Sequence, residues 1–78
     1  MDFSDAIIER ILELCQKKNM NVNMLATRAG INPSTIRSIL KKRCNSPKAD
    51  TIYYICIGFD ISLKEFYNSP IFENINDD

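Results

Sequence analysis

Apolar residues along most of this chain recur every three or four positions, which is the spacing of one face of an α-helix. In the segment FSDAIIERILELCQKKN, residues 3–19, these positions are Ile7, Ile8, Ile11, Leu12, Leu14 and Cys15. The strict alternation that is typical of a β-strand does not extend over any useful length. The pattern therefore predicts an all-α protein that begins with an amphipathic helix, with Asp2 or Ser4 as its N-cap.

Capping residues and a glycine predict where the next helices begin and end. Asn21 can cap a helix that Gly30 ends, because glycine readily adopts the left-handed conformation that follows a helix. Asn32 can cap the following helix, with Pro33 in its first turn, where the missing N–H costs nothing. After the first helix we expect helices over residues 22–29, 33–42, 49–57 and 63–67.

The last third of the chain carries further end signals. Gly58 is expected to end the fourth helix, and Ser62 with Glu65 forms a capping box for the fifth. The remaining residues, NSPIFENINDD, mix apolar and acidic side chains. We expect one compact domain over residues 1–69, followed by an acidic-apolar tail over residues 70–78.

The distribution of charge adds a first indication of function. The formal net charge is +0, from ten basic and ten acidic residues. Between Leu14 and Ala49, however, there are eight basic residues and no acidic residue. A solvated surface normally mixes the two signs, so this segregation favours a face that binds a polyanion, with chance clustering as the alternative.

Other kinds of chemistry have little support in the sequence. It contains no histidine, and its three cysteines show no CxxC spacing, which argues against a metal site or a disulfide framework. Cys15 and Cys56 are expected in the core, and a redox role for Cys44, which lies among basic residues, is the less favoured alternative. We therefore expect no enzyme, no cofactor and no metal. Since no apolar run is long enough to span a membrane and no signal peptide is recognisable, we expect a cytoplasmic protein.

The second and third predicted helices fit together around Gly30. Ala26 is small enough to let another helix approach closely. The residues expected to face a shared core are Leu25, Ala29, Ile31, Ile36, Ile39 and Leu40. Two short helices that cross around a tight turn form a helix-turn-helix, so the sequence predicts this motif.

The opposite face of the third predicted helix carries Ser34, Arg37, Ser38 and Lys41, which can form hydrogen bonds and include no acid. Such a face can enter a DNA major groove, where Arg37 can form two hydrogen bonds with guanine. Thr35 borders this face, and its methyl group can contact a thymine methyl group. The alternative is that the face only contacts water.

The spacing of these residues resembles a known family. Leu25, Ala26, Gly30, Ile31, Ile36 and Ile39 match the pattern of the lambda-repressor/Cro-type helix-turn-helix proteins, also called the XRE family. The segment GFDISLKEFYNSP is also similar to one often found in small bacterial members. The resemblance covers nearly the whole chain and implies a five-helix DNA-binding domain of bacterial or phage type.

The resemblance also implies roles for individual residues. The expected base-reading residues are Pro33, Ser34, Thr35, Arg37 and Ser38. The expected phosphate-binding residues are Asn21, Asn23, Lys41, Lys42, Arg43 and Asn45. Val22 and Pro33 stand where several phage repressors have glutamine, so no glutamine-based reading is expected. Lys48 stands where the family often has a serine or threonine cap.

These features together predict a sequence-specific transcriptional regulator. Most relatives act as dimers, and a single half-site would discriminate poorly within a genome. The expected dimer surface is Phe66, Tyr67, Ile71, Phe72 and Ile75, with completion of the core as the alternative role. The second hypothesis is a protein-interaction module, such as the antitoxin of a toxin–antitoxin pair, whose tail docks on a protein partner.

Overall fold

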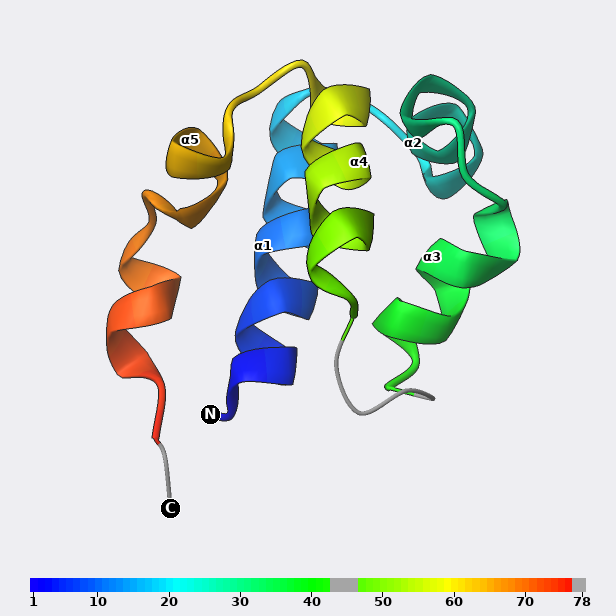
Figure 1. The fold of residues 1–78 in the computed structure, drawn as a ribbon. Helices are drawn as coiled ribbons and strands as arrows, with labels where there is room; N and C mark the ends of the chain where they lie inside the picture. Colours follow the sequence, from blue (N-terminus) through cyan, green and yellow to red (C-terminus); the bar gives the residue numbers. More distant parts are fainter. Residues whose placement is uncertain (43–46, 77–78) are drawn as a thin grey trace.

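Five α-helices and a short 3-10 helix follow one another in the computed structural model, which describes residues 1–42 and 47–76 (Figure 1). They are α1 (Phe3–Lys17), α2 (Val22–Ala29), α3 (Pro33–Leu40), α4 (Ala49–Phe59), α5 (Leu63–Tyr67) and η1 (Pro70–Asn74). No strand is found in the described ranges. The predicted all-α, five-helix class is confirmed.

Local hydrogen bonds explain where four of the helices begin. The side chains of Asp2, Asn21, Asn32 and Ser62 each accept a hydrogen bond from a backbone N–H in the first turn of α1, α2, α3 and α5, respectively. These bonds satisfy donors that have no partner within the helix itself. At α4, Lys48 occupies the N-cap and makes no such bond, because a lysine side chain has no hydrogen-bond acceptor.

Residues with positive φ explain where the first three helices end. Gly30 follows α2 with φ 73°, as predicted. α1 and α3 each end two residues before the predicted position, and each is followed by a residue in the left-handed region, Asn19 (φ 56°) and Lys42 (φ 55°). Neither residue is a glycine, so these two ends were not recognised in the sequence.

The prediction that Gly58 ends the fourth helix is wrong. α4 continues through Phe59 and ends at Asp60, which has φ 60°. Gly58 lies inside the helix and is buried, facing α2. A Cβ atom at Gly58 would lie 2.9 Å from Leu25 Cδ1 and 3.0 Å from Ala29 Cβ. The absence of a side chain therefore allows α2 to pack closely against α4.

The core lies between these elements. In Figure 1, α1 and α4 occupy the middle of the view, α2 and α3 lie together at one edge, and α5 and η1 lie at the other. Residues with no exposed surface are Ala6, Ile7, Ile11, Leu25, Ala26, Ile36, Ile55 and Phe66. Each of the five α-helices thus contributes at least one apolar side chain to a shared core.

On α1, the apolar residue Leu12 is exposed and the charged residue Arg10 is buried. Leu12 was expected on the apolar face, but it is 52% exposed. Arg10 is only 5% exposed, and its Nε donates to the carbonyl oxygen of Phe66 at 2.7 Å, while Nη2 donates to that of Glu65 at 2.8 Å. Arg10 also pairs with Glu13. Its guanidinium therefore joins α1 to two backbone carbonyl groups at the end of α5.

Residues 70–76 pack against the helices that precede them. The ring of Phe72 is half-buried and lies 5.0 Å from that of Tyr67, centroid to centroid. The backbone N–H of Asn76 donates to the carbonyl oxygen of Met1 at 2.9 Å. The sequence predicted no element here, because the 3-10 helix is short and lacks a periodic apolar face.

We expect Gly58→Ala to lower the free energy of unfolding by about 1–3 kcal/mol, because the added methyl group overpacks the α2–α4 contact. Urea unfolding followed by circular dichroism measures this change. Alanine is otherwise a better helix former than glycine by about 1 kcal/mol. A stability equal to or above that of the unchanged protein would therefore contradict the close contact.

Candidate nucleic-acid interface

A tight turn over residues 30–32 joins α2 to α3. The backbone N–H of Gly30 donates to Thr27, and the N–H of Ile31 donates to Ala26 at 3.1 Å, which closes the end of α2. The side chain of Ile31 packs against the core. Asn32 is extended and caps α3 directly. The predicted helix-turn-helix arrangement is confirmed.

The two faces of α3 differ in exposure. Ile36 is fully buried and Ile39 is 4% exposed, so these side chains hold α3 against the core. Ser34, Thr35, Arg37 and Lys41 are exposed, whereas Pro33, Ser38 and Leu40 are half-buried. The outward face of α3 is thus open to solvent except at Ser38, which is partly covered, and a groove-binding helix requires such an open face.

One contact links the two helices of the motif on this open side. The Arg37 Nη2 donates a hydrogen bond to the Asn23 Oδ1 at 2.9 Å. The sequence assigned these residues to different tasks, base reading and phosphate binding. They are 14 positions apart, and only the crossing of α2 and α3 brings them together.

The caps of α2 and α3 also occupy part of the predicted interface. Asn32 Oδ1 accepts hydrogen bonds from both the backbone N–H and the hydroxyl of Ser34, each at 2.9 Å. The Ser34 oxygen therefore keeps its lone pairs for an external donor. Asn21 Oδ1 accepts from the backbone N–H of Met24 at 2.8 Å, which leaves its amide nitrogen as a donor.

Lys42 is engaged within the protein. Its Nζ lies 2.9 Å from Asp5 Oδ1 and 3.2 Å from Asp2 Oδ2. The backbone N–H of Asp5, followed by the Lys42 ammonium, lowers the pKa of Asp2 below its ordinary value of 3.8. Hydrogen bonds to Asp5 and Asp2 raise the pKa of Lys42. A phosphate would therefore have to compete with two carboxylates for Lys42, while Arg43 and Asn45 lie outside the described residues.

The predicted dimer surface is only partly exposed. Phe66 is fully buried and completes the core, which corrects its prediction as a surface residue. Tyr67 is 38% exposed, and the side chains of Ile71, Phe72 and Ile75 are half-buried. The ring of Phe72 covers part of the Tyr67 ring. Four of the five predicted side chains therefore reach the surface.

An exposed apolar surface on α4 was not predicted from the sequence. Tyr53, Tyr54 and Ile57 are 51%, 42% and 48% exposed, and the two tyrosine rings lie 5.8 Å apart. The signal for it was present, because Ile52, Ile55 and Cys56 have the spacing of one helical face, and they lie in the core. The residues between them then had to face outward.

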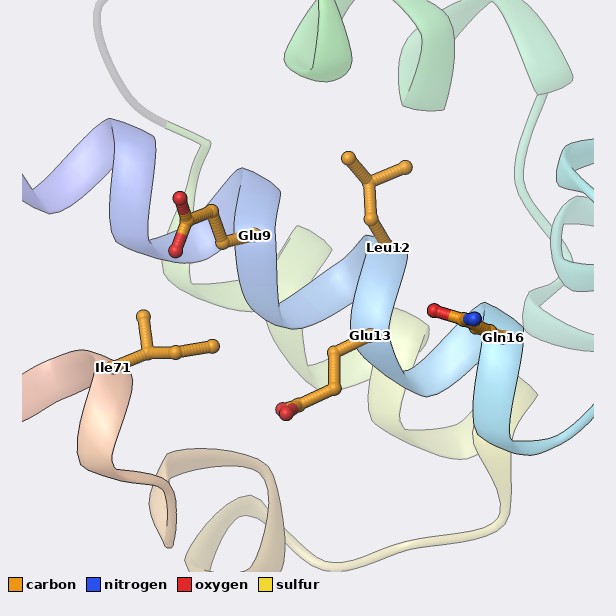
Figure 2. A pocket seen from close by; sticks show the side chains of 5 residues that line it. All are labelled: Glu9, Leu12, Glu13, Gln16 and Ile71. Carbon is orange, nitrogen blue, oxygen red and sulfur yellow. The ribbon is translucent and has the colours of Figure 1, made fainter.

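A shallow groove of about 370 Å³ lies between α1 and η1 (Figure 2). It is lined by Glu9, Leu12, Glu13, Gln16 and Ile71. Figure 2 shows that these side chains leave the two helices in different directions and do not converge on one point. The groove therefore lacks the enclosed, convergent polar groups of a typical small-molecule site.

The described residues offer no group of side chains that could hold a metal ion, and they contain no helix that could cross a membrane. Burial raises the pKa of the Cys15 and Cys56 thiols, which favours their protonated form. Cys44 lies outside the described residues. The open face of the helix-turn-helix thus remains the best-supported candidate site.

The profile of the Cro/C1-type HTH DNA-binding domain matches residues 10–69, which is most of the chain. The chain belongs to the Cro/C1-type helix-turn-helix family. Its fold is similar to that in the crystal structure of the prophage Lp1 protein 11, with a TM-score of 0.81, 29% sequence identity, and coverage of 96% of this chain and 100% of that chain. No curated protein shows a significant match. The family resemblance seen in the residues is confirmed.

In this Cro/C1-type protein, Lys42→Met should raise the pKa of Asp2 toward 3.8, because the ammonium group stabilises the carboxylate. The Asp5 N–H remains, so part of the lowering should persist. Since the pKa of Asp2 is lower in the folded state, the stabilisation is present above 3.8 and is lost as the pH falls through the folded-state value. An NMR titration of the Asp2 carboxyl carbon measures the midpoint.

Lys18→Met is the matched control, because this substitution removes the same charge. Lys18 is exposed and lies at the opposite end of α1 from Asp2. It should leave the Asp2 midpoint unchanged. Equal midpoints for Lys42→Met and the unchanged protein would show that the Lys42–Asp2 contact does not form in solution.

Proposed function

We propose that this protein is a sequence-specific transcriptional regulator that inserts α3 into the major groove of DNA. The observation that carries the proposal is the exposed, acid-free face of α3 in a Cro/C1-type domain. On the opposite side of the helix, Ile36 and Ile39 hold α3 against the core. A major groove about 12 Å wide admits an α-helix, and its base edges present donors and acceptors to such a face. This function requires no catalytic step, and we place it in the cytoplasm.

Base reading is assigned to the outward side chains of α3. Arg37 is the strongest candidate, because a guanidinium group can donate to guanine O6 and N7 at the same time. Ser34 and Ser38 are weaker readers, since a hydroxyl can donate or accept and so fits several bases. Thr35 offers a methyl group to thymine, and Pro33 lies at the end of α3 that leads into the groove.

Phosphate binding is assigned to residues on both sides of α3. Asn21 and Asn23 begin α2 and have amide nitrogens that can donate to phosphate oxygens. Lys41 is exposed beyond the end of α3. Lys42 would bind phosphate by exchanging its two aspartate partners for it. By resemblance to the family, Arg43 and Asn45 extend this set.

A homodimer follows from the need for selectivity. One recognition helix contacts too few base pairs to select a site among genomic competitors, whereas two half-sites combine their discrimination. We propose Tyr67, Ile71, Phe72 and Ile75 as the dimer surface. We do not propose the antitoxin alternative, because neither the family match nor the structural neighbour favours a role in binding a protein partner.

Selection of bound sequences from a random DNA pool should enrich a palindromic motif with half-sites about 10 bp apart, one turn of DNA. Binding to this motif should weaken steeply with salt, because each neutralised phosphate releases counterions. Sequencing of the bound pool, followed by titration at several salt concentrations, measures both effects. A pool without any enriched motif would contradict the proposed function.

Arg37→Ala should cost about 1–3 kcal/mol of binding free energy and relax the preference at one base pair of each half-site. Lys41→Ala is the matched comparison, since it removes one positive charge that we assign to phosphate. It should weaken binding equally on all sequences and reduce the salt slope by about one. If Arg37→Ala behaves like Lys41→Ala, Arg37 is a phosphate contact and not a base reader.

A further inference from the structure

The hydrogen bond between Asn23 and Arg37 has a defined direction. A guanidinium group has only donors, so the Asn23 amide must present its oxygen to Arg37 Nη2, as the 2.9 Å contact to Oδ1 shows. The amide nitrogen of Asn23 then faces another direction, with two N–H donors of its own. Asn23 thus accepts from the recognition helix with one end of its amide and can donate with the other.

Asn23 is itself held in place by the protein. It lies in the first turn of α2, two residues after the N-cap Asn21. The backbone carbonyl oxygen of Asn23 accepts a hydrogen bond from Thr27 Oγ1 at 2.9 Å. α2 in turn packs against α4 at Gly58, where Leu25 and Gly58 meet closely. The acceptor for Arg37 is therefore attached to a rigid part of the domain.

Arg37 needs such an anchor more than the other outward residues of α3. Its side chain is long and exposed, so it samples many rotamers in the absence of a partner. A two-bond contact with guanine requires one orientation of the planar guanidinium group. The group has five N–H donors, so a bond from Nη2 to Asn23 leaves enough of them for guanine O6 and N7.

We propose that Asn23 is a specificity-determining positioning residue, whose amide oxygen orients Arg37 toward one base pair while its amide nitrogen donates to a backbone phosphate. Asn23 then couples the register of the protein on the phosphate backbone to base reading by α3. This inference rests on the proposed function, because it requires α3 in the major groove. It adds to the phosphate role expected for Asn23 a second role that the sequence did not indicate.

The test is a double-mutant cycle of Asn23→Ala, Arg37→Ala and the combination of both. Each protein is titrated with the selected DNA site and with a site in which only the base pair relaxed by Arg37→Ala is changed, at one salt concentration. The ratio of the two dissociation constants is the discrimination. Asn23→Ala should lower it about 2- to 12-fold, the value of one ordinary hydrogen bond. The double variant should discriminate no worse than Arg37→Ala alone.

Asn23→Asp separates the two roles of the amide. The carboxylate keeps an acceptor for Arg37, but it loses the N–H donors and repels phosphate. This variant should bind both sites more weakly and keep the discrimination of the unchanged protein. Asn68→Ala, at an exposed asparagine after α5, is the matched control and should change neither quantity.

The outcomes distinguish this inference from the proposed function. If Arg37→Ala relaxes one base pair but Asn23→Ala weakens both sites equally, only the inference is overturned. Stronger binding or sharper discrimination by Asn23→Ala also overturns it, because Asn23 would then restrain Arg37 from reaching the base. If the unchanged protein selects no motif, the proposed function and this inference are both overturned. If it selects a motif but Arg37→Ala relaxes no base pair, the base-reading role of Arg37 and this inference are overturned, and the proposed function stands. Thermal unfolding of each variant confirms that it is folded.

Discussion

The close contact between α2 and α4 is the constraint on which the placement of the open face of α3 depends. Gly58 has no side chain, and the space where one would lie is filled by Leu25 and Ala29 of α2. Because the turn at Gly30 leads directly from α2 to α3, the position of α2 also sets that of α3. Ile36 then anchors α3 from within the same core. The orientation of the open face thus follows from packing on its buried side.

Two charged side chains join segments that lie far apart in the sequence. Arg10 is buried and donates to carbonyl groups at the end of α5, which connects the first helix to the last. Lys42 connects the end of α3 to the start of α1 through Asp2 and Asp5. The segregation of charge along the sequence is therefore not complete in space, because one basic residue of the acid-free segment meets two acids. Exposed pairs of this kind contribute little to stability, but they influence which cations remain available to a phosphate.

The candidate interface uses the same residues for folding and for recognition. Asn21 caps α2 with its amide oxygen and keeps its amide nitrogen as a donor. Asn32 caps α3 and orients the hydroxyl of Ser34. Asn23 meets Arg37 across the two helices. Polar groups that are held by the fold before DNA arrives lose less conformational entropy on binding, which favours selectivity at a small interface.

Local signals in the chain were enough to predict the fold class, the bounds of α2 and α5, and the two faces of α3, because caps, turns and helical periodicity act over a few neighbouring residues. They did not determine the roles of Gly58, Arg10 and Leu12, nor the contact between Asn23 and Arg37. A glycine that ends a helix and one that admits a neighbouring helix look alike in a single sequence, and a buried arginine is recognised only once its carbonyl partners are known. These features depend on residues that are distant along the chain, so only the tertiary structure decided them.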